Sequence, residues 1–186
     1  MSYCQCHDHC HPIHEGHTEG LVIPLRVGER LDDIPLVVYN PKTGQQEELM
    51  LHSCIARQTI VVFYEADFAD HCAQDLEQLA AKAHERENQQ TDLIVVSTDS
   101  VFSHKKRCET EPRLTSFRMM MVADKTAELS RMLGLYDVHT GNCLSAVALI
   151  DQHHHIMSLD ILPAGVSLSA DEILRRLTQL RTRSSS

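Results

Sequence analysis

The sequence contains no tryptophan, and aromatic residues make up only 4% of it. A core must therefore be built mainly from Leu, Val, Ile and Met. Long apolar runs are also absent, since no stretch approaches the roughly 20 apolar residues that a membrane-spanning helix needs. The first residues lack the basic stretch followed by an apolar run that marks a secretory signal peptide. From these absences we expect a cytoplasmic protein with no membrane partner.

Positive charge is scarce as well. The chain has 17 Lys and Arg against 26 Asp and Glu, which gives a formal net charge of −9 at pH 7. Such a balance argues against nucleic acid as a partner, because a phosphate backbone is bound by basic surfaces. Seven cysteines without a signal peptide indicate a reducing compartment, with metal or redox chemistry rather than a disulfide framework.

Cysteine and histidine are concentrated in residues 1–20, which hold almost no apolar side chains and so cannot pack a core. Thiolate and imidazole are ligands of zinc and copper, but this cysteine spacing is not a common zinc-finger pattern. Two interpretations stay open: a native metal site, or a disordered tail that binds metal only adventitiously. The candidate ligands are Cys4, Cys6, Cys10, His7, His9 and His11. We expect residues 21–183 to form one domain and residues 184–186 to be a tail.

The stretch around Cys72 organises the rest of the chain. The unbroken apolar and aromatic run Ile60–Tyr64 predicts a buried central strand. After a polar loop, apolar residues recur at helical spacing, so we expect Cys72 in the first turn of a helix. The predicted apolar face consists of Cys72, Leu76, Leu79, Ala80 and Ala83. Unpaired N–H groups and the helix dipole there favour the nucleophilic thiolate, although a buried, inert thiol is the commoner fate of a free cysteine.

The remaining chain alternates between predicted strands and helices. The predicted strands are 36–39, 48–51, 60–64, 93–97, 117–122, 144–150 and 156–161. Further helices are expected over 100–109, over 125–133 and from Ser169 onward, with Cys54 in a loop. This order predicts an α/β domain of the thioredoxin-like type.

Several motifs resemble the peroxiredoxins, the alkyl hydroperoxide reductase and thiol-specific antioxidant family. Tyr64, Asp67, Phe68 and Cys72 match its peroxidatic loop in identity and spacing, and Asp75 stands where the family has Glu. Other family-like segments follow in order: 97–104, 122–124, 149–151, 162–165 and 171–172. The resemblance implies a divergent member with the peroxiredoxin type of fold, commonly a homodimer.

The same resemblance implies a thiol peroxidase. Cys72 would reduce hydrogen peroxide or alkyl hydroperoxides through a sulfenic acid, and a thioredoxin-like or other thiol reductant would restore it. No cofactor is required for this chemistry.

The usual catalytic set of the family is nevertheless incomplete. Its Pro, Thr and Arg positions hold Glu65, Ala69 and Ala127. Arg131 lies four residues after Ala127, on the same face of the predicted helix, and is therefore a candidate replacement for the arginine. Carboxylates near Cys72 raise a thiol pKa, and only His71 beside it can oppose them. We therefore expect the pKa of Cys72 at about 8 or above.

The sequence does not identify the resolving cysteine, the thiol that would react with the sulfenic acid. Asp75 rather than a cysteine stands three residues after Cys72, which excludes a thioredoxin-type dithiol. Cys108 and Cys143 are the candidate resolving cysteines of the domain, and residues 1–20 offer three more. Two functions stay open: a thiol peroxidase, or a catalytically weak peroxiredoxin-fold protein that acts as a metal-binding or redox-sensing module.

Overall fold

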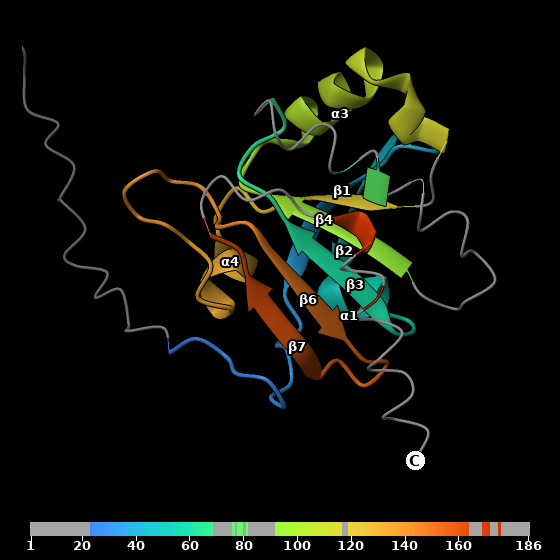
Figure 1. Cartoon of the computed structure of the whole chain (residues 1–186). Helices are drawn as coiled ribbons and strands as arrows, with labels where there is room; N and C mark the ends of the chain where they lie inside the picture. Colours follow the sequence, from blue (N-terminus) through green and yellow to red (C-terminus); the bar gives the residue numbers. More distant parts are fainter. Residues whose placement is uncertain are drawn as a thin grey trace, which may run out of the picture.

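The computed structural model describes residues 23–68, 76, 78, 79, 81, 92–116, 119–163, 169–171 and 175. Within these residues seven strands form one sheet in the order β2-β1-β5-β4-β3-β6-β7 (Figure 1). The strands are β1 (Pro35–Asn40), β2 (Gln45–Met50), β3 (Thr59–Phe63), β4 (Asp92–Ser97), β5 (Met120–Ala123), β6 (Ala146–Ile150) and β7 (Ile156–Ile161). The helical elements are α1 (Leu51–Cys54), α3 (Val101–Thr110), α4 (Glu128–Met132) and the 3-10 helix η2 (Pro112–Ser116).

Three parallel strands, β3, β4 and β5, form the middle of the sheet. β1 pairs antiparallel with β5 and β6 pairs antiparallel with β3, and the hairpins β1–β2 and β6–β7 complete the two sides. Every residue of β3 is buried, as the sequence predicted for the central strand. Val61 and Phe63 belong to one core cluster, while Ile60 and Val62 belong to the other. Because successive side chains of a strand point to opposite faces, the sheet carries a core on both faces.

Helices cover these two cores. The first cluster contains residues of α1 and α4, and the second contains residues of α3. Leu76 and Leu79 are helical and lie in the second cluster, with 1% and 0% of their surfaces exposed. The prediction of a buried helix face is confirmed at these two positions, while Ala80 and Ala83 lie outside the described residues. Cys72 itself lies outside the described residues.

The predicted helix over 125–133 is too long, because α4 begins only at Glu128. The N–H of Ala127 bonds to the carbonyl of Asp124 at 2.8 Å, and Ala127 has a left-handed φ of 56°. A turn therefore occupies the first three predicted positions. The strand predicted from residue 117 begins at Met120, and Cys54 ends α1 rather than lying in a loop.

The described part of the chain offers no helix with both the length and the apolar character needed to span a bilayer.

Candidate active site

Acidic residues follow the three parallel strands at their carboxyl ends. Asp67 comes after β3, Asp99 after β4 and Asp124 after β5, and parallel strands end at a common edge of the sheet. Oδ2 of Asp99 accepts the backbone N–H of Asp67 at 2.8 Å and the Ser97 hydroxyl at 2.9 Å. The chain that leaves β3 is thereby attached to the end of β4.

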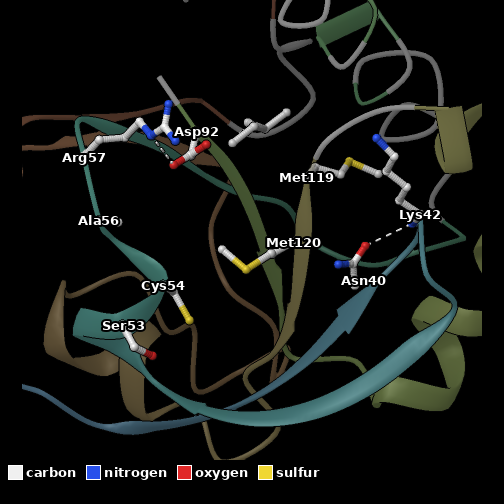
Figure 2. A pocket seen from close by; sticks show the side chains of 10 residues that line it. Asn40, Lys42, Ser53, Cys54, Ala56, Arg57, Asp92, Met119 and Met120 are labelled. Atoms are coloured by element: carbon white, nitrogen blue, oxygen red, sulfur yellow. Dashed lines mark hydrogen bonds and ion pairs between the residues drawn. The ribbon is translucent and has the colours of Figure 1, made fainter. Parts of the chain in front are cut away.

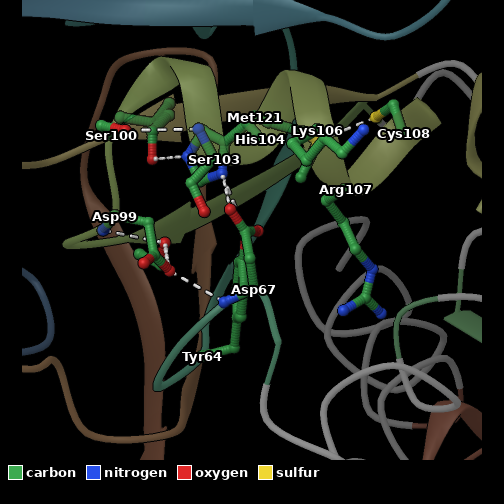
Figure 3. Close-up of polar contacts among 12 residues, drawn as sticks. Tyr64, Asp67, Asp99, Ser100, Ser103, His104, Lys106, Arg107, Cys108 and Met121 are labelled. Atoms are coloured by element: carbon green, nitrogen blue, oxygen red, sulfur yellow. Dashed lines mark hydrogen bonds and ion pairs between the residues drawn. The ribbon is translucent and has the colours of Figure 1, made fainter. Parts of the chain in front are cut away.

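A fully buried polar cluster lies beside this attachment (Figure 3). The Tyr64 hydroxyl donates to Oδ1 of Asp67 at 2.7 Å, and Nδ1 of His104 lies 2.9 Å from Oδ2. Nε2 of His104 donates to the carbonyl of Val122 at 3.1 Å. Both carboxylate oxygens of Asp67 are thus engaged, and the loop after β3 is joined to α3 and β5.

The hydrogen bonds of this cluster change the acidity of its members. Burial raises the pKa of Asp67, but hydrogen bonds from His104 and Tyr64 outweigh it, so the net shift of the pKa is downward. Burial and the neighbouring Asp67 carboxylate hold the pKa of Tyr64 well above its usual value. The cluster therefore contains an ionised carboxylate and a neutral phenol at neutral pH.

Cys143 lies at the same edge of the sheet. Its thiol donates to the carbonyl of Tyr64 at 2.9 Å, and only 1% of the residue is exposed. Burial, aided by the charge of Asp124, raises the pKa of Cys143 to about 12.

Cys108 is also a buried thiol. Its Sγ lies 3.6 Å from Sδ of Met121, and burial raises its pKa to about 12. Attack on another sulfur requires an accessible thiolate, which neither Cys108 nor Cys143 offers in this conformation. The resolving role predicted for each stays a prediction that requires the thiol to become exposed.

Arg131 lies over an aromatic ring. Its guanidinium carbon is 4.4 Å from the centroid of Tyr136, a cation–π geometry. Ala127 precedes the first residue of α4 and has a left-handed φ, so the prediction that Arg131 shares a helix face with Ala127 is wrong. The predicted role of Arg131 toward Cys72 stays a prediction.

Arg107 is a buried charged residue near the polar cluster that the sequence did not predict. It lies in α3 with 3% of its surface exposed, and its guanidinium carbon is 5.9 Å from the ring centroid of Phe68. Its Nε and Nη2 find no hydrogen-bond partner among the described residues. Helical spacing could have found it, because Arg107 stands three residues after the buried His104 and so shares its face.

A separate pocket of about 410 Å³ lies at the opposite edge of the sheet, around the amino ends of β3 and β4 (Figure 2). Nε of Arg57 and Oδ2 of Asp92 form an ion pair of 3.0 Å there. Cys54, Met119 and Met120 contribute sulfur atoms to the lining. Because it flanks the amino ends of the strands, this pocket is not part of the candidate active site.

Several predicted site residues lie outside the described part of the chain: Cys72, His71, Asp75, Cys4, Cys6, Cys10, His7, His9 and His11. Within the described part, no group of three or more His, Cys, Asp or Glu residues is placed to hold a metal ion. The N-terminal metal site therefore stays a prediction.

The matching family model and the similar proteins are all alkyl hydroperoxide reductases or peroxiredoxins. The model of the AhpC/TSA family matches residues 27–158. Alkyl hydroperoxide reductase C of Amphibacillus xylanus is 29% identical over 119 residues, which cover 64% of this chain and 63% of that protein. The chloroplastic 2-Cys peroxiredoxin of Hordeum vulgare is 30% identical over 128 residues, which cover 67% of this chain and 61% of that protein. The chain thus matches less than two thirds of the length of these relatives.

A solved structure shows the same fold. The crystal structure of Enterococcus faecalis AhpC matches with a TM-score of 0.79 at 21% identity, covering 86% of this chain and 94% of that one. The predicted thioredoxin-like fold is confirmed by this likeness.

Proposed function

The chain belongs to the AhpC/TSA family, and from this premise we propose that it is a thiol-dependent peroxidase whose reacting sulfur is Cys72. The observation that carries the proposal is that the family match, residues 27–158, contains Cys72 together with the polar cluster at the carboxyl edge of the sheet. Cys72 follows β3 in the sequence, and β3 is the buried central strand.

In the proposed reaction, all the oxidation and reduction on the protein side takes place at sulfur. The Cys72 thiolate attacks one peroxide oxygen, an S–O bond forms and the O–O bond breaks. Water or an alcohol leaves after taking up a proton, and the sulfur, oxidised by two electrons, becomes a sulfenic acid. A thiol then condenses with the sulfenic acid to a disulfide and releases water, and a second thiol reduces that disulfide. No cofactor is needed, because thiols supply both electrons.

The described residues support this proposal by fixing the chain that precedes Cys72. Asp67 holds the loop through Tyr64 and His104, and Asp99 holds it through the backbone N–H of Asp67. These hydrogen bonds fix the chain after β3 at Asp67, and a fixed scaffold beside a reacting group lowers the entropic part of the barrier.

We further propose a dithiol of the thioredoxin type as the reductant, hydrogen peroxide or an alkyl hydroperoxide as the substrate, a homodimer as the assembly and the cytoplasm as the location. The cysteines that the structure describes, Cys54, Cys108 and Cys143, are all free thiols, which supports a reducing compartment. Within the described residues nothing favours the metal-binding or redox-sensing alternative.

Substitution of the reacting cysteine tests the proposal. We expect Cys72→Ser to abolish thiol-dependent consumption of hydrogen peroxide, measured under excess dithiothreitol. Cys54→Ser is the matched control, because Cys54 lies at the opposite edge of the sheet and should leave the rate unchanged. Undiminished consumption by the Cys72→Ser protein would show that another group reacts with peroxide.

A further inference from the structure

Two histidine rings from distant parts of the sequence stack on one another. The ring centroids of His52 and His154 lie 3.8 Å apart, and the two ring planes make an angle of 11°. His52 belongs to α1, and His154 lies in the turn between β6 and β7. His154 has a left-handed φ of 70°, a conformation that a residue with a Cβ keeps only where its surroundings hold it. The stack is therefore a fixed contact between α1 and this turn.

The segment that precedes β1, residues 24–34, is attached at this stack. The carbonyl of Leu31 lies 2.8 Å from Nε2 of His52, and the N–H of Leu31 donates to the carbonyl of His154 at 2.9 Å. Leu31 is 2% exposed and belongs to the first core cluster. One residue of the segment is thus bonded to both members of the stacked pair.

The hydrogen bonds of the pair fix which ring nitrogens carry a hydrogen. A carbonyl only accepts, so Nε2 of His52 donates to Leu31, and Nδ1 is the remaining site for a proton. Arg30 donates through Nε to the carbonyl of His153 at 3.1 Å, and its Nη2 lies 3.4 Å from Nδ1 of His154. A guanidinium has only donors, so the contact with His154 is a hydrogen bond only while that Nδ1 carries no proton. The observed contact of Arg30 therefore requires a neutral His154.

The charges around the stack treat the two rings differently. Oδ2 of Asp33 lies 3.7 Å from Nδ1 of His52, so a proton on His52 has an anion to answer it. His154 faces the positive Arg30 instead. Burial and the charge of His52 lower the pKa of His154, aided by Arg30 and opposed by the backbone of His52 and by Asp33. The surroundings thus resist a proton on His154.

The remaining charged groups of the segment and the turn lie around these residues. Asp151 accepts the backbone N–H groups of His153 and His155 at 2.8 and 2.9 Å, and its Oδ2 lies 3.6 Å from Nδ1 of His155. Glu29 and Asp32 are exposed on the segment. A proton on His155 therefore has a carboxylate to answer it and should not weaken the turn.

We propose that the stack of His52 on His154 is a pH-sensitive latch, which attaches residues 24–34 to α1 and to the turn at neutral pH and loosens this attachment as both rings gain protons. Two protonated rings 3.8 Å apart bring like charges together, and a proton on His154 replaces its hydrogen bond with Arg30 by a repulsion. Because the folded protein lowers the pKa of His154, the stabilisation is present above the usual value of 6.5 and is lost as the pH falls through the folded-state pKa. The latch does not depend on the proposed peroxidase function.

Amide hydrogen exchange tests the latch, once the rates are corrected for their intrinsic dependence on pH. The N–H of Leu31, which bonds to His154, should lose protection between about pH 7.5 and about pH 5. The expected loss is about tenfold for each unit by which the pKa of His154 is lowered. The N–H of Val62, in the central strand β3, is the internal reference and should keep its protection. Equal losses at both amides would show acid unfolding of the whole domain and would contradict the latch.

Variants assign the loss of protection to the stacked rings. His154→Asn removes the titrating ring but keeps a residue that tolerates a left-handed φ, so the protection of Leu31 should no longer depend on pH. His139→Asn is the matched control, because His139 is exposed in another turn and its replacement should leave the pH dependence unchanged. In His52→Gln, which removes the like charge, the imidazole resonances of His154 should titrate closer to 6.5 than in the wild type. An unchanged pH dependence in His154→Asn, or an unchanged titration of His154 in His52→Gln if the first variant does not fold, would overturn the inference.

Discussion

Asp67 makes the central contacts of the buried polar cluster. Its carboxylate accepts a hydrogen bond from the Tyr64 hydroxyl and forms an ion pair with His104. Its backbone N–H donates a hydrogen bond to the carboxylate of Asp99. Asp67 and His104 are both fully buried, so loss of one partner leaves the other without compensation. Asp67 therefore controls both the stability of the domain and the position of the loop before Cys72.

We predict that Asp67→Ala lowers the free energy of unfolding by about 3–5 kcal/mol, because it leaves His104 buried without its partner. Tyr64→Phe removes one hydrogen bond to the same carboxylate and should cost only about 1 kcal/mol. Denaturant unfolding at pH 7 measures both values. Similar losses in the two variants would contradict the assignment of Asp67 as the centre of the cluster.

The pH dependence provides a control for this prediction. The pKa of Asp67 in the folded protein lies below its usual value of 3.8. Its ionised form therefore adds stability that is complete above that value and is lost as the pH falls through the folded-state pKa. As the pH falls through the folded-state pKa of Asp67, the difference in unfolding free energy between the wild type and Asp67→Ala should become smaller.

At the scale of elements, local sequence patterns predicted the central strands more accurately than they predicted the first residue of α4. Continuous apolar runs identified β3 and β4, because burial of a strand on both faces requires such runs. The start of α4 instead depends on Asp124, whose carboxylate accepts the N–H groups of Leu129 and Ser130 at 3.2 and 2.8 Å. That capping acts across several residues, so helical periodicity alone could not reveal it.

Gly134 lies two residues after the end of α4, and its replacement gives a test at this scale. Gly134 has a φ of 68°, and a Cβ there would lie 2.9 Å from Cβ and Cγ of Pro24. We predict that Gly134→Ala lowers the free energy of unfolding by about 2–4 kcal/mol, the sum of backbone strain and overpacking. Gly141→Ala is the matched control, because Gly141 has a φ of 75° but no atom within 4 Å of the added Cβ.

The control should cost only about 1–2 kcal/mol, from the left-handed backbone alone. Thermal or denaturant unfolding of the two variants measures the difference. Equal losses of unfolding free energy in the two variants would show that Pro24 moves to accommodate the added Cβ, so that its packing against Gly134 adds no stability.

At the scale of the whole molecule, the sequence predicted the fold more fully than the contacts of the candidate site. Motifs in the family's order led to the thioredoxin-like sheet, because each motif belongs to a particular strand end. The pairing of Asp67 with His104 joins residues 37 positions apart, and the burial of Arg107 depends on how α3 packs. The Asp67–His104 contact leaves no local pattern in the sequence, whereas the burial of Arg107 is indicated only by its helical spacing from His104. The metal site predicted in residues 1–20 stays a prediction.

Trapping of the sulfenic acid tests the central claim, that this chain is a peroxidase acting through Cys72, most directly. The reduced protein is treated with one equivalent of hydrogen peroxide in the presence of a carbon nucleophile that labels sulfenic acids, and the label is located by peptide mapping. We predict that the label lies on Cys72, and that the buried Cys54, Cys108 and Cys143 carry none. Consumption of the peroxide with no label on Cys72, or with the label on another cysteine, would contradict the account.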